Sequence, residues 1–241
     1  MAGSRSPRGG SLDPVEIILV RHGQPAWSVD GHSRHDPSLT ELGAIQAKKT
    51  AARLARRLPG ITEILVSPAV RSQETAAPLI EATGIDAVTI DDLTEMRLPQ
   101  WEGEPEDRVQ RIFAESRLRA PAQWWDGIDG GESFRDFHRR IDGALTGILA
   151  ERGVTPDPDH RHLWRSEGGD GTIVLVAHGG TNSVALTVLL GVEPTPWEWE
   201  RFVLGHASIA RVRNVPLAGG HVWSLRAFND QEHLAADERS R

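Results

Sequence analysis

The sequence predicts an α/β fold with a mainly parallel central sheet that helices cover on both faces. Three short apolar runs, rich in β-branched residues, are typical of buried strands: residues 16–20, 62–66 and 172–177. A segment with the apolar spacing of a helix follows each run: residues 40–58, 69–83 and 181–190. Strands that alternate with helices favour parallel pairing, and a parallel sheet is normally buried on both faces.

The first helix has recognisable ends. Thr40 is placed to cap the helix at 40–58, and Pro59 with Gly60 ends it. Residues 85–90 are a weaker strand candidate, because their apolar run is shorter and more polar.

The second half of the chain has more interruptions. Residues 104–150 show helical patterns broken by a Gly-Gly pair. Residues 153–171, rich in Pro, Asp, His and Gly, are expected to form a long surface loop. Two late strands are expected at 207–213 and 221–226, with a turn between them.

The length of the chain, 241 residues, suits one substantial α/β domain, which we expect over residues 15–228. Residues 1–14 are polar and rich in Gly, Ser, Pro and Arg, so they are expected to be a disordered extension. Residues 229–241 are expected to be a polar C-terminal tail. The chain contains no cysteine, which excludes disulfides and thiolate metal ligands.

Charge and hydropathy indicate which classes of molecule the chain can bind. A formal net charge of −7 argues against a nucleic-acid surface, which needs a basic stripe. It leaves room for an anionic small molecule, because salt screens charges that lie more than about 10 Å from a cleft. The chain shows neither a signal-peptide core nor an apolar run long enough to span a bilayer, so we expect a cytoplasmic protein without a membrane partner.

Two segments resemble each other, IILVRHG at 17–23 and IVLVAHG at 173–179. Each has four apolar residues, one variable residue and then His-Gly, at a point where a strand runs out toward a helix. Ligands of open parallel sheets bind at the carboxyl ends of strands. If both strands are parallel and central, His22 and His178 project into one cleft, although two unrelated histidines at strand ends would give the same pattern.

Arg21, His22 and Gly23 form a group suited to phosphate chemistry. A histidine at a strand end is a nucleophile when its attacking nitrogen is unprotonated and well positioned. The planar guanidinium of Arg21 can bind a phosphoryl oxygen, and Gly23 permits close approach of the backbone. Taken alone, Arg-His-Gly is a weak signal, because a basic pair at a strand end, with glycine turning the chain, gives the same pattern.

Two further candidates follow the strand at 62–66. Arg71 lies one turn into the next helix, where it either points back over the cleft or stays solvated at the surface. A poor alkoxide leaving group needs a proton, which a nearby carboxylic acid supplies. Glu95 is the candidate acid, and its rivals by sequence are Asp91, Asp92 and Glu102.

Other catalytic classes have weaker support. Four histidines lie in polar loops: His32, His35, His160 and His162. They lack the ordered spacing of a metal site, so neither a metal nor a cofactor is expected. The sequence has no Gly-x-Ser-x-Gly elbow and no phosphate-loop signature, which weakens the interpretations as a serine hydrolase or an NTPase.

Six short motifs occur in the order found in the histidine phosphatase superfamily, which includes the cofactor-dependent phosphoglycerate mutases. They are RHG at 21–23, LTELG at 39–43, SPAVRSQETA at 67–76, LTEMRLPQWEG at 93–103, GES at 131–133 and AHGG at 177–180. Each motif is short, and the chain resembles the family because all six occur in order.

The resemblance implies a three-layer α/β/α sandwich with a helical cap insertion. It also implies that His22 is the phosphorylated nucleophile and that Glu95 is the proton donor. Arg21, Arg71 and His178 would surround the phosphoryl group. Positive groups and backbone N–H donors would then stabilise the transferring phosphoryl group without a metal.

Three further residues are expected to line the phosphate pocket. Gly179 follows the second histidine in the AHGG motif. Gln24 stands where many relatives have glutamate, and Ser28 where many have an asparagine that touches the phosphoryl group. Serine is shorter than asparagine but still donates a hydrogen bond.

The resemblance also bears on the reaction. Mutases typically follow the acid with an Arg-His-Tyr-Gly run, whereas this chain ends the motif with Trp101-Glu102-Gly103, which looks like the phosphatase branch. We therefore expect hydrolysis of a small phosphate ester through phospho-His22, by a chain that can also form a homo-oligomer. The alternatives are mutase-type phosphoryl transfer and a non-catalytic phosphate-binding module.

Residues 99–140 are expected to cover the cleft, because they lie between the acid and the next core element. Trp101, Trp124 and Trp125 in this segment either form an apolar lid that stacks on a ring or sugar, or simply pack within the cap.

Overall fold

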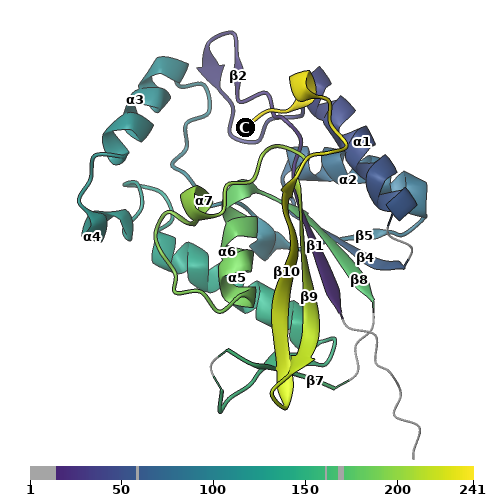
Figure 1. Ribbon diagram of the computed structural model, residues 1–241. Coiled ribbons are helices and arrows are strands. Elements are labelled where there is room, and N and C mark those ends of the chain that lie inside the picture. The colour runs from purple at the N-terminus through teal and green to yellow at the C-terminus, as the bar shows by residue number, and fades with distance from the viewer. Residues whose placement is uncertain (1–14, 58–59, 161, 168–170) are drawn as a thin grey trace, which may run out of the picture.

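The computed structural model describes residues 15–57, 60–160, 162–167 and 171–241, so the extension predicted at 1–14 lies outside the described residues. An eight-stranded sheet runs through the molecule in the order β5-β4-β8-β1-β9-β10-β7-β6 (Figure 1). Its strands are β1 (Glu16–Arg21), β4 (Ile61–Val66), β5 (Ala87–Thr89), β6 (Val154–Pro156), β7 (Trp164–Ser166), β8 (Thr172–Ala177), β9 (Ile209–Leu217) and β10 (Gly220–Asp230). A separate small ribbon pairs β2 (Ser28–Val29) with β3 (His32–Ser33).

Helices cover both faces of the sheet (Figure 1). The α-helices are α1 (Glu41–Arg57), α2 (Val70–Thr83), α3 (Glu106–Ser116), α4 (Pro121–Trp124), α5 (Phe134–Ala150), α6 (Gly179–Leu189) and α7 (Glu198–Arg201). Two short 3-10 turns are η1 (Asp91–Leu93) and η2 (Ala236–Glu238). Within the described ranges, no helix combines the length and the apolar character that crossing a membrane requires.

Alternate residues of the central strands build two separate cores. Ile18 and Val20 of β1 pack with residues of α1 and α2, including Leu54 and Leu79. Ile17 and Leu19 belong to the other cluster, with residues of α5 and α6. Successive strand residues point to opposite faces, so both faces must be apolar when helices cover both. The three-layer sandwich expected from the sequence is confirmed.

The two similar segments are neighbours in the sheet. Strands β1 and β8 pair in parallel, with Ile17 opposite Ile173 and Arg21 opposite Ala177. The repeat is therefore in register, and each strand ends one residue before its histidine. This pairing places His22 and His178 at the same edge of the sheet, as the sequence predicts.

The expectation of a mainly parallel sheet is wrong for half of it. Strands β5, β4, β8 and β1 are parallel, whereas β9, β10, β7 and β6 join through antiparallel pairs. Strands β9 and β10 form a hairpin whose turn holds Ala218 and Gly219 at positive φ. Strands joined by a tight hairpin must run antiparallel, because a parallel return needs a long crossover.

Two other segments differ from the expected outline. The predicted surface loop at 153–171 contains β6 and β7, which extend the sheet edge, because β7 pairs with β10 and β6 pairs with β7. Strand β10 continues to Asp230, and the chain after it folds back over α1 (Figure 1). There Gln46 Nε2 donates to the Glu238 carbonyl at 2.7 Å and the Ser240 carbonyl accepts from His206 N at 3.0 Å.

The helical cap insertion lies between Glu95 and α5, with α3 and α4 set apart from the sheet in Figure 1. The three tryptophans named from the sequence have different surroundings. Trp101 packs edge-on against Phe113 of α3 at a centroid distance of 5.4 Å. Trp125 packs against buried Phe134 at 5.4 Å, while Trp124 meets Trp197 at 5.7 Å.

Candidate active site

A cleft of about 630 Å³ opens at the carboxyl ends of β1 and β8. Five of the residues named from the sequence line it: Arg21, His22, Arg71, Glu95 and Gly179. His178 is fully buried beside it, with its ring centroid 5.2 Å from that of His22. The sheet thus brings together side chains that lie more than 150 positions apart in the sequence.

Hydrogen bonds fix the tautomer of His22. Its Nδ1 lies 2.8 Å from the Gly23 carbonyl oxygen, which only accepts, so Nδ1 carries the proton. Its Nε2 accepts from Arg71 Nε at 3.3 Å and therefore holds a lone pair. The unprotonated nitrogen of a neutral imidazole is the nucleophilic one.

The surroundings of His22 keep it neutral. Burial lowers its pKa well below the usual value, and the nearby His178, Arg71 and Arg21 lower it further. A charged imidazolium would lose its hydration here and face positive neighbours. His22 therefore retains its lone pair at physiological pH.

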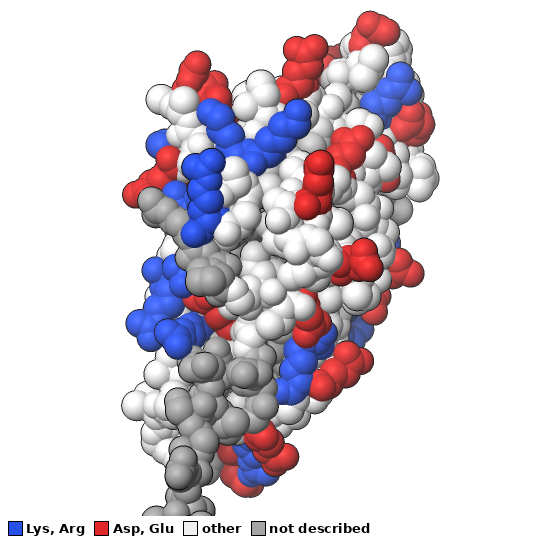
Figure 2. All heavy atoms as spheres, turned by 90° about the vertical axis from the view of Figure 1, so that its right-hand side faces the viewer, with Lys and Arg blue, Asp and Glu red and all other residues white. Residues whose placement is uncertain are grey.

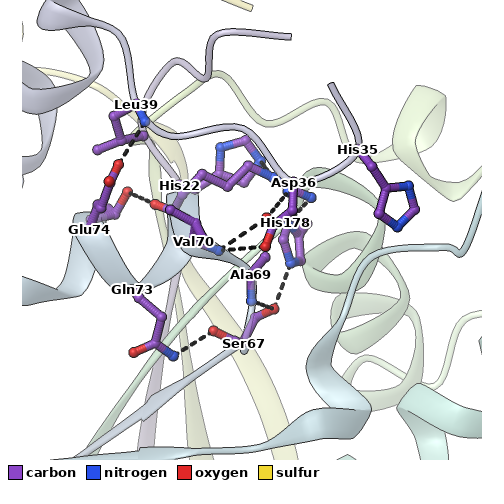
Figure 3. Close-up of polar contacts among 12 residues, drawn as sticks. His22, His35, Asp36, Leu39, Ser67, Ala69, Val70, Gln73, Glu74 and His178 are labelled. Carbon is purple, nitrogen blue, oxygen red and sulfur yellow. Dashed lines mark hydrogen bonds and ion pairs between the residues drawn. The ribbon is translucent and has the colours of Figure 1, made fainter. Parts of the chain in front are cut away.

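Arg71 links the two histidines. Its Nη2 donates to His178 Nδ1 at 3.1 Å, so Nε2 of His178 carries the proton and donates to Ser67 Oγ at 2.7 Å (Figure 3). Burial and the charges of Arg71 and Arg21 hold the pKa of His178 well below its usual range. The structure therefore resolves the two interpretations of Arg71, because its side chain is buried and points into the cleft.

Asp36 holds Arg71 from the opposite side. Its Oδ1 accepts from Arg71 Nη1 at 3.1 Å, and its two oxygens accept from Val70 N at 3.1 and 3.2 Å (Figure 3). Val70 begins α2, where free backbone N–H groups and the helix dipole favour a carboxylate. One carboxylate thus ties the loop before α1 to both the helix and its arginine.

Glu95 reaches the cleft because glycine leaves room for it. Its Oε2 accepts from Gly180 N at 2.8 Å, and its Oε1 accepts from Met96 N at 3.0 Å. A Cβ at position 180 would collide with Oε1. The second glycine of the AHGG motif is therefore needed for the carboxylate to approach the first turn of α6.

The terminal nitrogens of Arg21 are anchored, whereas its buried Nε is unpaired among the described residues. Its Nη1 donates to the Leu204 carbonyl, and its Nη2 lies 3.2 Å from His206 Nε2. Within the described part of the chain, its buried Nε has no hydrogen-bond partner. An N–H donor left unpaired in a cleft is suited to an oxygen of a bound anion.

His206 is a buried residue that sequence reasoning missed. Its Nε2 accepts from Arg21, an obligate donor, so its Nδ1 carries the proton and donates to Ser240 Oγ at 2.9 Å. Burial, with the charge of Arg21, lowers its pKa to about 3. No local pattern marks His206, because only the turn into β9 brings it against β1.

The glycine after the nucleophile allows two backbones to meet. A Cβ on Gly23 would lie 2.6 Å from the Gly43 carbonyl oxygen, and a Cβ on Gly43 would collide with the Gln24 carbonyl. The glycines of the RHG and LTELG motifs thus let the start of α1 pack against the strand end that carries His22.

Gln24 and Ser28, named from the sequence for the phosphate pocket, are not among the residues that line the cleft. The side-chain oxygen of Gln24 accepts from Thr40 Oγ1 at 2.8 Å, which joins it to the start of α1. Ser28 pairs with Ser33 in the small ribbon. Trp27, between them, lines the cleft instead, and its ring lies 4.7 Å from Arg71 Cζ.

The rival acids lie elsewhere. Asp91 and Asp92 are exposed in η1, and Glu102 pairs with Arg34 at 3.0 Å on the surface. Among the residues that the structure describes, no three His, Asp or Glu side chains converge as metal ligands would. What does converge is a neutral histidine, two guanidinium groups, a second histidine and one carboxylate.

The chain belongs to the histidine phosphatase superfamily. It matches the family model described as "Histidine phosphatase superfamily (branch 1)" over residues 17–231. The resemblance seen in the six motifs is thereby confirmed.

Individual relatives differ in their named activities. A Yersinia pestis protein named "Probable phosphoglycerate mutase GpmB" is 32% identical, over 94% of this chain and 100% of its own length. The structure of a mycobacterial glucosyl-3-phosphoglycerate phosphatase is 26% identical with a TM-score of 0.66, covering 89% of this chain and 98% of that one. A phosphoserine phosphatase from Entamoeba histolytica shares the fold at 23% identity, with a TM-score of 0.63 and 92% and 100% coverage.

Proposed function

We propose that this chain is a phosphomonoester hydrolase that works through a phosphohistidine at His22. The observation that carries the proposal is the lone pair on His22 Nε2, which meets an arginine at the cleft. Two positively charged guanidinium groups, on Arg21 and Arg71, line the same cleft and are suited to the oxygens of a phosphoryl group.

In the first step, His22 Nε2 attacks phosphorus and the bond from phosphorus to the ester oxygen breaks. Glu95, in its protonated form, gives its proton to the leaving oxygen, so that an alcohol departs rather than an alkoxide. Arg21 and Arg71 stabilise the charge on the transferring oxygens. The Gly23 carbonyl accepts a hydrogen bond from His22 Nδ1–H throughout, which favours the positively charged phosphoimidazole ring that forms.

In the second step, water replaces the alcohol. Glu95, now a carboxylate, takes a proton from the water while its oxygen attacks phosphorus and the bond to Nε2 breaks. Inorganic phosphate leaves, and both His22 and the protonated Glu95 are restored. Because each step needs only one acid–base group and fixed positive charge, we propose that the reaction needs no metal and survives chelation by EDTA.

Mutase-type transfer is the second candidate, since the 32%-identical relative carries a mutase name. A mutase returns the phosphoryl group to another hydroxyl instead of giving it to water. The solved structure at 26% identity is named a phosphatase, and the Trp101-Glu102-Gly103 ending favours that branch.

We further propose a small-molecule partner rather than a nucleic acid or a membrane. Acidic and basic side chains both occur on the face that includes α1 and α2 (Figure 2). A surface that binds nucleic acid carries a continuous stripe of basic residues, and this mixture of charges is unlike one. A homo-oligomeric state and a cytoplasmic location stay predictions.

One experiment separates these functions. The chain and its His22→Ala variant are incubated with an aryl phosphate and, separately, with 3-phosphoglycerate, and both inorganic phosphate and isomerised product are measured. Phosphate release that His22→Ala abolishes is expected. Isomerisation without net phosphate release would identify a mutase, and no turnover of a wide ester panel would favour a non-catalytic module.

A further inference from the structure

A second hollow, of about 480 Å³, lies between the cap and the core. This volume is within the range of small-molecule pockets. Its walls are largely apolar and come from the segment after Glu95, from α3, from α4 and the residues that follow it, and from α7. They include Met96, Leu98, Phe113, Trp124, Ile128 and Trp199.

The hollow continues the catalytic cleft on the side of the acid. Three apolar side chains line both spaces, together with one arginine: they are Met96, Leu98, Trp199 and Arg117. Met96 directly follows Glu95 and donates its backbone N–H to the carboxylate. Because Glu95 faces the leaving oxygen in the proposed reaction, the group attached to that oxygen extends toward Met96 and into the hollow.

Three polar side chains around the hollow already have partners, and a fourth, Gln110, is exposed on α3. Ser116 Oγ donates to the carbonyl of Ile112, one turn earlier in α3, at 2.8 Å. Arg119 donates to the Gly127 carbonyl, and Arg117 pairs with Glu200 at 2.8 Å. A sugar or an amino acid that entered here would lose hydration and gain few hydrogen bonds, which disfavours polar ligands.

The aromatic walls are held in place by other rings. Trp124 meets Trp197 edge-on at 5.7 Å, and Trp199 packs 6.2 Å from Phe134, which is fully buried. Side chains fixed in this way keep a pocket open for a ligand, so little ordering is required when the ligand binds.

We infer that the hollow is the binding site for the leaving group of the substrate, and that this group is apolar, either aromatic or aliphatic. The inference rests on the proposed phosphatase function. It assigns the substrate class as phosphate monoesters of apolar alcohols rather than of sugars or hydroxy acids.

The test uses n-alkyl phosphates from ethyl to octyl, which have nearly equal leaving-group basicity. A rise in kcat/KM of up to about fourfold for each added methylene is expected until the hollow is filled. Glycerol phosphate and phosphoserine are expected to react no faster than ethyl phosphate. A flat or falling series, or a preference for the polar esters, would overturn the inference.

Ala114→Leu supplies the structural arm of the test. Ala114 is an exposed helical residue that borders the hollow, so leucine occupies ligand space without removing a core contact. The variant is expected to lower kcat/KM for octyl phosphate by about tenfold or more and to leave ethyl phosphate within about twofold. Ala55→Leu, the same change at an exposed position of α1, is the matched control and should resemble the original chain.

Failure of the proposed function is distinguishable from failure of this inference. If no ester is hydrolysed, binding of methylphosphonate and octylphosphonate is compared by calorimetry. If octylphosphonate binds more tightly and Ala114→Leu abolishes the difference, the hollow is supported as an apolar binding site, even though the proposed hydrolysis has failed. Equal binding of the two phosphonates, or an Ala114→Leu effect matched by Ala55→Leu, would overturn it.

Discussion

The strand-end site and the cap are built in different ways. At the strand ends, His22, Arg71 and His178 are at most 5% exposed and are held by hydrogen bonds to one another. In the cap, the ion pairs of α3 lie on the surface, where Arg111 and Asp107 are both more than 70% exposed. Exposed pairs of this kind contribute little to stability.

The difference indicates that the strand-end site carries out the phosphoryl transfer, whereas the cap selects the substrate. A buried network tolerates few changes, because losing one partner leaves the other buried and unpaired. The walls of the apolar hollow act mainly through volume, so side chains there can change size without affecting the transfer step. We therefore expect substitutions at the strand ends to lower turnover for every substrate, and substitutions in the cap to change the order of preference.

The largest expected effect is that of Glu95→Gln, which removes the proton donor but keeps an acceptor toward Gly180. It is expected to slow turnover of alkyl phosphates by about 10²–10⁴-fold, because their alkoxides need a proton. Formation of phospho-His22 from aryl phosphates should suffer less, as shown by a burst of phenol release. Glu102→Gln is the matched control, and equal slowing of the first step for both ester classes would move the acid role to another residue.

Arg71→Ala is expected to lower kcat/KM by about 10²–10³-fold for every ester, since it removes one preorganised contact to the transferring group. The comparison variant is Arg139→Ala, which removes an arginine 78% exposed in its side chain. Near-normal activity of correctly folded Arg71→Ala, seen by circular dichroism, would place the phosphoryl group elsewhere in the cleft.

Asp36 offers a smaller and more specific effect, as a positioning residue that acts through Arg71. Asp36→Ala is expected to lower kcat by about tenfold, because Val70 N and Arg71 Nη1 both lose an acceptor. Asp36→Asn retains one acceptor oxygen and is expected to restore most of the activity. Steady-state kinetics with one aryl phosphate checks both, and equal activity of the two variants would assign the carboxylate no role in placing Arg71.

The smallest expected effect is on the pH dependence of the free energy of unfolding, through His233. Burial is the main cause that lowers the pKa of His233 to about 4, compared with about 6.5 in an unfolded chain. Below pH 6.5 the unfolded chain therefore binds a proton that the folded chain does not, and stability falls as the pH drops toward 4. Above pH 6.5 this contribution is constant.

Nε2 of His233 lies 2.9 Å from Thr50 Oγ1; His233→Gln keeps a side chain that can hydrogen-bond to this hydroxyl, and it removes the titrating group. Urea unfolding at pH 7 and pH 5 should show a smaller loss of stability in the variant than in the original chain. An unchanged difference between the two pH values would mean that His233 does not contribute to it.

The strand-end chemistry could be predicted from the sequence because it is local. The paired IILVRHG and IVLVAHG segments place His22 and His178 directly, since parallel strands in register must end together. Arg71, the second residue of α2, was left open between cleft and surface by its local pattern, and only the family resemblance assigned it to the phosphoryl group. A local motif thus becomes a site whenever a buried strand fixes where it ends.

The rest depends on contacts that no local pattern records. His206 and Asp36 reach the site from a turn and a loop whose residues resemble any surface segment. Trp199, on the short α7, is distant in sequence from the cap tryptophans. Only the folded chain shows that it lines the same hollow as Met96. The two late strands and the turn between them were expected, but β6 and β7 were missed because they are short and polar and lie in a segment rich in turn residues.

The most direct test of the account is to trap the intermediate. The chain is mixed with an aryl phosphate, quenched rapidly into base during turnover, and digested for peptide mass spectrometry. The account predicts phosphate on the peptide containing Arg21-His22-Gly23, bound through a nitrogen–phosphorus bond that is stable in alkali and labile in acid. Phosphate on the peptide containing His178, or a burst of phenol without any covalent species, would contradict it.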